Sequence, residues 1–584
     1  MTSSYKAPVA DLEFLFDRVL DMAALRALPA FAAVDEEVVR GVLAEGARFA
    51  EGVLAPINAA GDEQASRLVE GRVRYSPGFA QAYAKYCEGG WAGFDLPADL
   101  GGQGMPRVLQ AAFAEMSNGA NLAFSMLPVT MRAAARLLMA HGSEEQVKRW
   151  VPGMIDGSIA TTIVITEPQA GSDVGRARSL ATPQADGTYR LTGTKVFISN
   201  ADNEFTPQIV HMVLARTPGA PAGTRGISLF LVPQVLEDGR RNTVRVARVE
   251  HKMGLRASPT CVVEFEDAQA LRIGEAGRGL QAMFAMVNTM RLEVAVQGVG
   301  IGGAALNRAV QHALERTQGG APDQPPRAII EHPDVRRMLL TMRARVEGLR
   351  ALVLEAALQI DLGENHPQPS VAAKAAGFAQ WLLPICKACS TDMGFEVAST
   401  AIQVFGGYGY ITDTGVEQYA RDVRVGAIYE GTNGIQAIDL VTRKLIADRA
   451  TRLSEFVEAM RTSVKATAAE PAVDAIREGV AKGADLLELV SRELLARAGQ
   501  SRAADIEAGA VPYLKLAGLV GGAWMWLRMA AAAGEATPLH QGKRATARFY
   551  AQVLLPEAEL LARQALLGTG AAGGLGRDHW AAGW

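Results

Sequence analysis

The spacing of apolar residues divides the chain into helical and strand-like stretches. Up to about residue 158, apolar and charged residues recur at helical spacing, as in 36–43 and 131–138. From Thr161 to about residue 275, β-branched runs are separated by turn dipeptides such as Asp186-Gly187. The pattern predicts an N-terminal helical domain at 1–158 and a compact antiparallel β domain at 159–275. The expected strands are 161–166, 189–191, 196–199, 209–215, 227–232, 244–249 and 261–265.

Helical periodicity returns after about residue 276 and continues to the end of the chain. A helical bundle is expected at 276–448, interrupted by a polar, proline-rich loop at 319–326. An additional helical domain is expected at 449–584. The most apolar stretch, 514–534, is broken by Lys515, Arg528 and several glycines, so it predicts buried helices and no membrane span. The predicted fold class is therefore α+β and mostly α.

Charge and cysteine content restrict the possible partners. The chain has 584 residues, a formal net charge of -3 and 21% charged residues, which does not indicate a nucleic-acid or anionic-membrane binder. Its four cysteines are scattered, which favours a reducing compartment. The N-terminus has no uninterrupted apolar segment typical of a signal peptide. We therefore expect a cytoplasmic protein without a transmembrane segment.

Two strand ends carry candidate ligand-binding groups. The first strand ends in the sequence 163–173, IVITEPQAGSD, where a proline breaks it into a Gly-Ser turn. Such an end can direct main-chain N–H groups and hydroxyls at a planar ligand, although an ordinary strand-to-loop junction has the same features. The second, 193–201, GTKVFISNA, places Phe197 and Ser199 two residues apart and therefore on one face of a regular strand. An aromatic side chain beside a hydroxyl suits a flavin ring.

Two further motifs follow in the helical part, QVFGGYGY at 403–410 and YEGTNGIQ at 429–436. The ordered set TEPxAGSD, GxKxFIS, QxFGGYGY and YEGTNGIQ, within a helix, sheet, helix layout, resembles the acyl-CoA dehydrogenase family. The resemblance covers about residues 30 to 445. It implies an FAD-dependent enzyme that oxidises the α,β bond of an acyl-CoA thioester to the trans-2-enoyl-CoA.

The resemblance also implies roles for individual residues. Ile165, Thr166 and Ser199 would bind the flavin ring, beside Phe197, which replaces the family's more common tryptophan. Ser172 would contact the flavin diphosphate or CoA, and Thr432 would be a further cofactor contact. Residues of the bundle would bind the diphosphate and adenosine half of FAD across a dimer interface, which implies a homodimer or homotetramer. The implied cofactor-binding set is Ile163, Ile165, Thr166, Ser172, Phe197, Ser199, Arg316, Gln403, Gly406, Gly407 and Thr432.

Glu430 in YEGTNGIQ corresponds to the family's catalytic base, although most glutamates are exposed loop or surface residues. The α-proton must leave as the β-hydride moves to the flavin, so base and flavin must face opposite sides of the Cα–Cβ bond. Burial beside Tyr429 and Gly431 would raise the pKa of Glu430. Some relatives carry the base on the helix that here includes Asn288, but no acid precedes Arg291 there. Arg291 would order the site, or else lie on the helix surface. The implied substrate-binding residues are Ser172, Asn288, Arg291, Glu430 and Gly431.

Three other motifs favour structural interpretations. The sequences 298–303 and 568–573 match GxGxxG, but neither follows a clear strand, so close helix packing explains the first better than a Rossmann site does. Cys386 and Cys389 form a lone CxxC in an apolar run and are expected in the core. The eight histidines show no metal-binding spacing, and we expect no metal.

The additional domain and the sequence 330–339, IEHPDVRRML, resemble the larger bacterial acyl-CoA dehydrogenases. These include enzymes for fatty acyl-CoAs in β-oxidation, here expected to be of medium or long chain, and for 3-(methylthio)propanoyl-CoA. Electron-transferring flavoprotein is the expected electron acceptor. One alternative is an acyl-CoA oxidase. The other is a non-enzymatic, nucleic-acid-binding flavoprotein, and the near-neutral charge of 450–584 argues against this second alternative. We expect the additional domain to have a structural role, either covering the core or extending the dimer interface.

Overall fold

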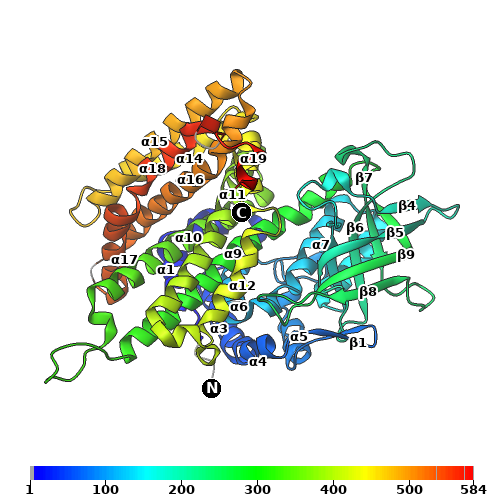
Figure 1. Cartoon of the computed structure of the whole chain (residues 1–584), viewed down its shortest axis with the longest axis horizontal. Coiled ribbons are helices and arrows are strands. Elements are labelled where there is room, and N and C mark those ends of the chain that lie inside the picture. Colours follow the sequence, from blue (N-terminus) through cyan, green and yellow to red (C-terminus); the bar gives the residue numbers. More distant parts are fainter. Residues whose placement is uncertain (1–4, 535, 571–572, 583–584) are drawn as a thin grey trace. The chain divides into compact units, whose positions relative to one another are not determined.

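The structure, a computed structural model, describes residues 5–534, 536–570 and 573–582 (Figure 1). The chain divides into two compact units. Unit 1 comprises Met1–Ala7 and Ala44–Glu293, and unit 2 comprises Pro8–Leu43 and Val294–Trp584. The expected fold class is confirmed, with helices before and after a central sheet. The second GxGxxG sequence includes residues 571 and 572, which lie outside the described residues.

The helices of unit 1 surround an apolar core. They include α4 (Asn58–Glu63), α5 (Phe79–Glu88), α6 (Arg107–Ser125), α7 (Pro128–His141) and α8 (Glu144–Asp156). α8 begins with a capping box between Ser143 and Gln146, and its C-cap is Gly157 at φ 85°. A short hairpin, β1 (Arg67–Val69) and β2 (Arg72–Arg74), was not predicted.

The central sheet of unit 1 closes on itself, because β7 pairs with both β6 and β9. Most pairings are antiparallel, as expected, but β6 runs parallel to β3 and β4. The chain between β3 and β6 is long enough to include a hairpin, which permits the parallel pairing. The strands are β3 (Ile159–Val164), β4 (Leu180–Pro183), β5 (Tyr189–Ser199), β6 (Gln208–Arg216), β7 (Ile227–Pro233), β8 (Val244–Val249) and β9 (Thr260–Ile273).

Two apolar clusters fix the position of β6. One face packs with residues of the neighbouring strands, including Val213 and Phe230. The opposite face, with Met212 and Leu214, packs against apolar residues of α7 and α8 such as Leu138. Because both faces are buried, the strand between Gln208 and Arg216 is apolar at every position except His211, instead of alternating. The end of the neighbouring strand β3 is thereby held in a fixed place.

Long and short helices together form the bundle of unit 2. They are α10 (Pro333–Asn365), α11 (Pro369–Phe405), α12 (Val416–Val423), α13 (Asn433–Asp439) and the part of α9 (Gly279–Glu315) that follows Glu293. The expected loop at 319–326 is present between α9 and α10. A Cβ at Gly298 of α9 would lie 2.3 Å from the carbonyl oxygen of Ser390 in α11. Close helix packing therefore explains the first GxGxxG sequence.

The C-terminal helices pack on this bundle within unit 2. They are α14 (Thr451–Ala466), α15 (Asp474–Gly499), α16 (Ala503–Ala532), α17 (Pro538–Phe549) and α18 (Glu557–Leu567). The indole of Trp526 in α16 donates to the carbonyl oxygen of Ala344 in α10 at 2.8 Å, and Arg528 bonds Glu355 at 2.7 Å. The apolar stretch 514–534 therefore contributes to one long buried helix, where several were expected.

No single helix within the described residues is long and apolar enough to cross a membrane. By length and composition alone, α6 and α7 pass that test as a pair, which is bent by 95°.

The N-terminal helices belong to unit 2. The hydrophobic pattern of the sequence had instead predicted that they belong to an N-terminal domain ending at residue 158. These helices are α1 (Val9–Arg18), α2 (Met22–Arg26) and the part of α3 (Glu36–Phe49) up to Leu43. Asp11 of α1 forms ion pairs with Arg350 of α10, at 2.6 Å, and with the fully buried Lys543 of α17. The local pattern of apolar and polar residues does not reveal these pairings, because the partners are hundreds of residues apart.

Candidate active site

The first two motifs meet in unit 1 at the end of β3. Ile163 lies in the strand, and Ile165 and Thr166 follow it directly. The backbone N–H of Val196 donates to the carbonyl oxygen of Thr166 at 3.0 Å. The ammonium of Lys195 donates to the carbonyl oxygen of Ile165, also at 3.0 Å. The structure therefore brings together the two segments in which we expected flavin-binding groups.

A buried ion pair supports this junction. Lys195 Nζ lies 2.8 Å from Glu167 Oε1, and the carboxylate also accepts the backbone N–H groups of Arg178 and Ser179 at 2.7 and 3.1 Å. Burial alone would raise the pKa of Glu167, but the charge of Lys195 and these hydrogen bonds lower it to about 2. The carboxylate is therefore ionised at neutral pH and holds the chain that leaves β3.

Phe197 departs from regular strand geometry. It has φ 62°, and the pairing of β5 with β9 shifts register between Lys195 and Ile198. The expectation that Phe197 and Ser199 share one face assumed regular alternation, and this bulge breaks it. The side chain of Phe197 is 65% exposed, which presents its ring to a ligand, while Ser199 is half-buried. Ser172, in the turn after Ala170, is also exposed.

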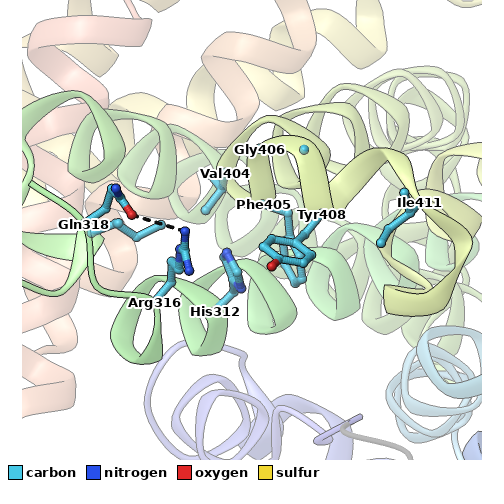
Figure 2. Close-up of a pocket in the computed structure, with 10 residues that line it drawn as sticks. His312, Arg316, Gln318, Val404, Phe405, Gly406, Tyr408 and Ile411 are labelled. Carbon is cyan, nitrogen blue, oxygen red and sulfur yellow. Dashed lines mark hydrogen bonds between the residues drawn. The ribbon is translucent and has the colours of Figure 1, made fainter.

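Unit 2 contains a pocket of about 470 Å³ at the C-terminal ends of α9 and α11 (Figure 2). It brings together Arg316, Gly406 and Gly407 from the expected cofactor-binding set. Gln403 is exposed in the preceding turn of α11 and does not line the pocket. The other lining residues are His312, Gln318, Ile329, Val404, Phe405, Tyr408 and Ile411.

The pocket combines aromatic rings with positive charge. The rings of His312 and Phe405 are stacked with centroids 4.0 Å apart, and the guanidinium of Arg316 lies 5.8 Å from the ring of Tyr408. Burial lowers the pKa of His312, and the charges of Arg316 and Arg308 lower it further. The imidazole is therefore neutral at pH 7, and Arg316 is the pocket's cationic group.

These residues fit the diphosphate and adenosine part of FAD. Gly406 has φ 62°, and a Cβ at Gly406 or Gly407 would meet no atom within 4 Å, so ligand atoms can approach the backbone there. A guanidinium beside exposed glycine backbone is a suitable donor set for phosphate oxygens. The stacked rings provide an apolar surface for a planar base.

Glu430 lies in a strained turn of unit 2, before α13. It has φ 54°, and Gly431 follows with φ 86°. The buried side chain of Gln436 donates to the carbonyl oxygen of Glu430 at 3.2 Å, and Thr432 caps α13 by accepting the N–H of Ile435 at 3.2 Å. Glu430 is half-buried, so the expected full burial is not observed within this chain.

The residue before the expected base is fixed by hydrogen bonding. The hydroxyl of Tyr429 donates to Gln297 Oε1. Burial raises the pKa of Tyr429, and the charge of Glu430 raises it further, so the phenol stays protonated. Tyr429 therefore anchors the N-terminal side of the turn to α9.

Arg291 and Asn288 lie on α9 within unit 1. Arg291 is only 7% exposed, and its guanidinium lies 5.8 Å from the ring of Phe284. The alternative that Arg291 is a helix-surface residue is therefore wrong. Asn288 is exposed.

Sequence reasoning missed the side chains that support these segments. The ammonium of Lys387 in α11 donates to the carbonyl oxygen of Gly431 at 2.7 Å. Lys195 and Lys387 share a visible signal, a lysine in a stretch that is otherwise apolar or strand-like. Cys386 is buried as expected, Cys389 is only partly buried, and all four cysteines are free thiols. Within the described residues, no group of three or more His, Cys, Asp or Glu side chains is placed to hold a metal ion.

Family models match nearly the whole chain. The acyl-CoA dehydrogenase N-terminal, middle and C-terminal domains match residues 39–158, 162–268 and 277–446. A fourth, described as acetyl-CoA dehydrogenase C-terminal like, matches residues 456–572. The chain belongs to the acyl-CoA dehydrogenase family. This acyl-CoA dehydrogenase is a flavin-dependent oxidoreductase, and its cofactor is FAD, so both expectations are confirmed.

Several relatives align with nearly the whole of this acyl-CoA dehydrogenase. The 3-methylmercaptopropionyl-CoA dehydrogenase of Ruegeria pomeroyi is 39% identical over 95% of this chain and 96% of its own. A broad-specificity linear acyl-CoA dehydrogenase of Mycobacterium tuberculosis is 32% identical over 95% and 96%. The structure of ACDH-11 of Caenorhabditis elegans in complex with C11-CoA has a TM-score of 0.77 at 20% identity, covering 94% and 92% of the two chains. This last likeness concerns the fold.

Proposed function

We propose that this enzyme converts a linear acyl-CoA thioester to the trans-2-enoyl-CoA, with Glu430 as the base that removes the α-proton. The observation that carries the proposal is the turn at Glu430. A non-glycine residue with positive φ costs about 1 kcal/mol or more and persists only where surrounding contacts impose it. Such strain concentrates at active sites, and here Gln436 holds the carbonyl of the strained residue.

The residues of this chain have separate tasks in the reaction. The carboxylate of Glu430 accepts the α-proton, and the backbone N–H of Glu430 donates to the thioester oxygen, which stabilises the developing enolate. Bound FAD would supply the acceptor for the β-hydride. Ile163, Ile165, Thr166 and Ser199 hold the flavin ring, with Phe197 packed beside it.

Other residues bind the remaining parts of cofactor and substrate. Arg316, Gly406 and Gly407 bind the FAD diphosphate, with Gln403, Ser172 and Thr432 as further contacts. Asn288, Arg291 and Gly431 contact the substrate. The proposal for Arg316 rests on its place in the pocket of unit 2.

Two substrate classes are supported by the relatives. The broad-specificity relative acts, by its name, on linear acyl-CoAs, and we propose a medium- or long-chain fatty acyl-CoA of β-oxidation as the substrate. The 39% identical relative, named for 3-methylmercaptopropionyl-CoA, supports the thioether thioester as a second candidate. We further propose a cytoplasmic homodimer or homotetramer that passes electrons to an electron-transferring flavoprotein.

The test is anaerobic titration of the purified holoenzyme with butanoyl-, octanoyl-, palmitoyl- and 3-(methylthio)propanoyl-CoA. We expect a substrate to bleach the oxidised flavin band in the wild type and not in Glu430→Gln. The exposed Glu493 provides the control, because Glu493→Gln makes the same chemical change outside the site. A wild type that retains FAD but is bleached by no acyl-CoA would contradict the proposal. Hydrogen peroxide release on aerobic turnover would identify an oxidase instead.

The same titration distinguishes the two substrate classes. A kcat/KM for 3-(methylthio)propanoyl-CoA far below that for octanoyl- or palmitoyl-CoA would exclude the thioether candidate. The reverse order would exclude the fatty acyl-CoA.

A further inference from the structure

Lys387 is a fully buried cation in the middle of α11, where the surrounding sequence is apolar. Its Nζ lies 2.7 Å from the carbonyl oxygen of Gly431 and 3.0 Å from Oδ1 of Asn433. Burying an ammonium costs several kcal/mol unless polar groups compensate it. Two of the polar groups that compensate the Lys387 ammonium belong to the segment that directly follows Glu430.

The conformation of that segment needs external support. Glu430 and Gly431 are consecutive residues with positive φ. The first is unfavourable for any residue with a Cβ, and at Gly431 a Cβ would lie 2.8 Å from Nε2 of Gln436. The turn therefore excludes a side chain at Gly431 and strains the backbone of Glu430.

Buried donors hold both carbonyl groups of this turn. Gln436, which is 0% exposed, donates to the carbonyl oxygen of Glu430 at 3.2 Å, and Lys387 donates to that of Gly431. The two contacts fix the orientations of two successive peptide planes. Because the Cα–Cβ bond of Glu430 leaves from the first of these planes, its direction is fixed with them.

Asn433 links the same turn to α11 a second time. Its Oδ1 accepts from Lys387, and its Nδ2 donates to Oδ1 of Asp392 at 2.8 Å and to the carbonyl oxygen of Ala388 at 3.2 Å. A charge-assisted hydrogen bond is roughly twice as strong as a neutral one. Of the two side chains that donate to the carbonyl groups of Glu430 and Gly431, Lys387 is therefore the charge-assisted donor.

We propose that Lys387 is a positioning residue for the catalytic base: it fixes the turn so that the Glu430 carboxylate is aligned with the α-proton. The inference rests on the proposed role of Glu430. Lys387 acts on the backbone and does not itself exchange a proton with the substrate. Its loss affects the rate of proton removal more than substrate binding.

The test compares Lys387→Met and Lys387→Arg with the wild-type holoenzyme by stopped-flow flavin reduction under anaerobic conditions. Misplacing a reacting group by about 1 Å can cost about 10²-fold in rate. We therefore expect Lys387→Met to lower the limiting rate of flavin reduction about 100-fold, with a substrate Kd within about threefold of wild type. Lys387→Arg, which keeps the charge and donors, should recover part of the rate.

Introducing Lys387→Met into a Glu430 variant shows whether Lys387 acts through Glu430. Glu430→Asp already displaces the carboxylate, so adding Lys387→Met should cost less than tenfold there, well below its cost alone. Glu430→Gln is measured separately. If Glu430→Gln is reduced at the wild-type rate, the proposed base is wrong. If Glu430→Gln is inactive and Lys387→Met is as fast as wild type, only the role of Lys387 is wrong.

Lys543→Met controls for the loss of a buried ammonium as such. Lys543 is also 0% exposed, but its partners Asp11 and Glu347 are not part of the Glu430 turn. We expect it to lower the melting temperature and to leave the limiting reduction rate within twofold of wild type. An equal rate loss in both variants would overturn the inference. If Lys387→Met does not accumulate, Lys387→Gln serves instead, and we expect it to lower the limiting rate of flavin reduction about tenfold. A wild-type rate in Lys387→Gln would again overturn the inference.

Discussion

Lys195 and Glu167 form a buried ion pair that joins β5 to the chain leaving β3, with 2.8 Å between Nζ and Oε1. Lys195 also donates to the carbonyl oxygens of Ile165 and Leu214, at 3.0 and 2.7 Å. A single ammonium thus connects β5 and β6 to the segment that leaves β3 and carries expected flavin-binding residues. Two consequences for stability follow from this pair.

Replacing Lys195 by Met should destabilise unit 1 by about 3–5 kcal/mol, because the carboxylate of Glu167 would stay buried without its cation. The measurement is urea unfolding of the purified protein. The double variant Lys195→Met/Glu167→Gln should recover part of the loss. Arg176→Met breaks the exposed pair between Arg176 and Asp173, and it should change stability by less than about 1 kcal/mol. Equal losses in Lys195→Met and Arg176→Met would contradict the prediction.

The same pair should contribute to acid unfolding. The pKa of Glu167 is lowered from 4.5 to about 2 in the folded protein, so its contribution is complete above pH 4.5. It is lost as the pH falls from 4.5 to 2, where the unfolded state takes up a proton that the folded state does not. The unfolding free energy should therefore fall more steeply with decreasing pH in wild type than in Glu167→Gln. The difference in slope corresponds to the uptake of up to one additional proton on unfolding. Parallel curves for the two proteins across this window would argue against an ionised, paired Glu167.

The contact between α16 and α10 predicts opposite effects for two helix glycines. A Cβ at Gly348 would lie 2.9 Å from Nε1 of Trp526, whereas a Cβ at Gly377 would have no neighbour closer than 3.7 Å. Gly348→Ala should therefore destabilise unit 2 by about 1–3 kcal/mol. Gly377→Ala should be neutral or stabilising by up to about 1 kcal/mol, because alanine favours the helix. Thermal unfolding measures both, and a stabilising Gly348→Ala would show that α16 does not dock closely on α10.

Removing the charge of Arg316 should weaken FAD binding. A hydrogen bond to a charged group contributes about 1.5–3 kcal/mol, which corresponds to about 10- to 150-fold in Kd. We expect a rise of that size for Arg316→Gln, measured by reconstitution of the apoprotein with FAD. Arg337, which is exposed and pairs with Asp334 at 2.9 Å, is the matched control. An unchanged Kd in Arg316→Gln would mean that the pocket at α9 and α11 does not bind the cofactor.

Local patterns in the sequence predicted most of the elements, but not their pairing. The expected strands 189–191 and 196–199 are one strand, β5, because the turn-like Gly193 between them is accommodated in a bulge opposite β9. β4 was missed, since its sequence Leu180–Pro183 is short and ends in proline. Phe197 shows the same limit in the candidate site, because its left-handed backbone depends on the partner strand.

The supporting residues of the site were harder to predict than the motifs. The four motifs contain Glu430 and Thr166, which short sequence patterns identify. Lys387 lies 43 positions before Glu430 in the chain, within a helix whose apolar neighbours predict only core packing. Its role depends on the long-range contact with Gly431, which periodicity does not encode.

The pairing of Asp11 with Lys543 also sets an order for folding during synthesis. The segment Ala44–Glu293 is continuous and includes almost all of unit 1, so it can fold as soon as it leaves the ribosome. Asp11 can meet Arg350 after 339 further residues, but it has to wait for Lys543, which lies 532 residues later. At ~5–20 residues per second, that wait lasts about half a minute to two minutes. The first helix to be made therefore completes its buried ion pairs only when nearly the whole chain has been synthesised.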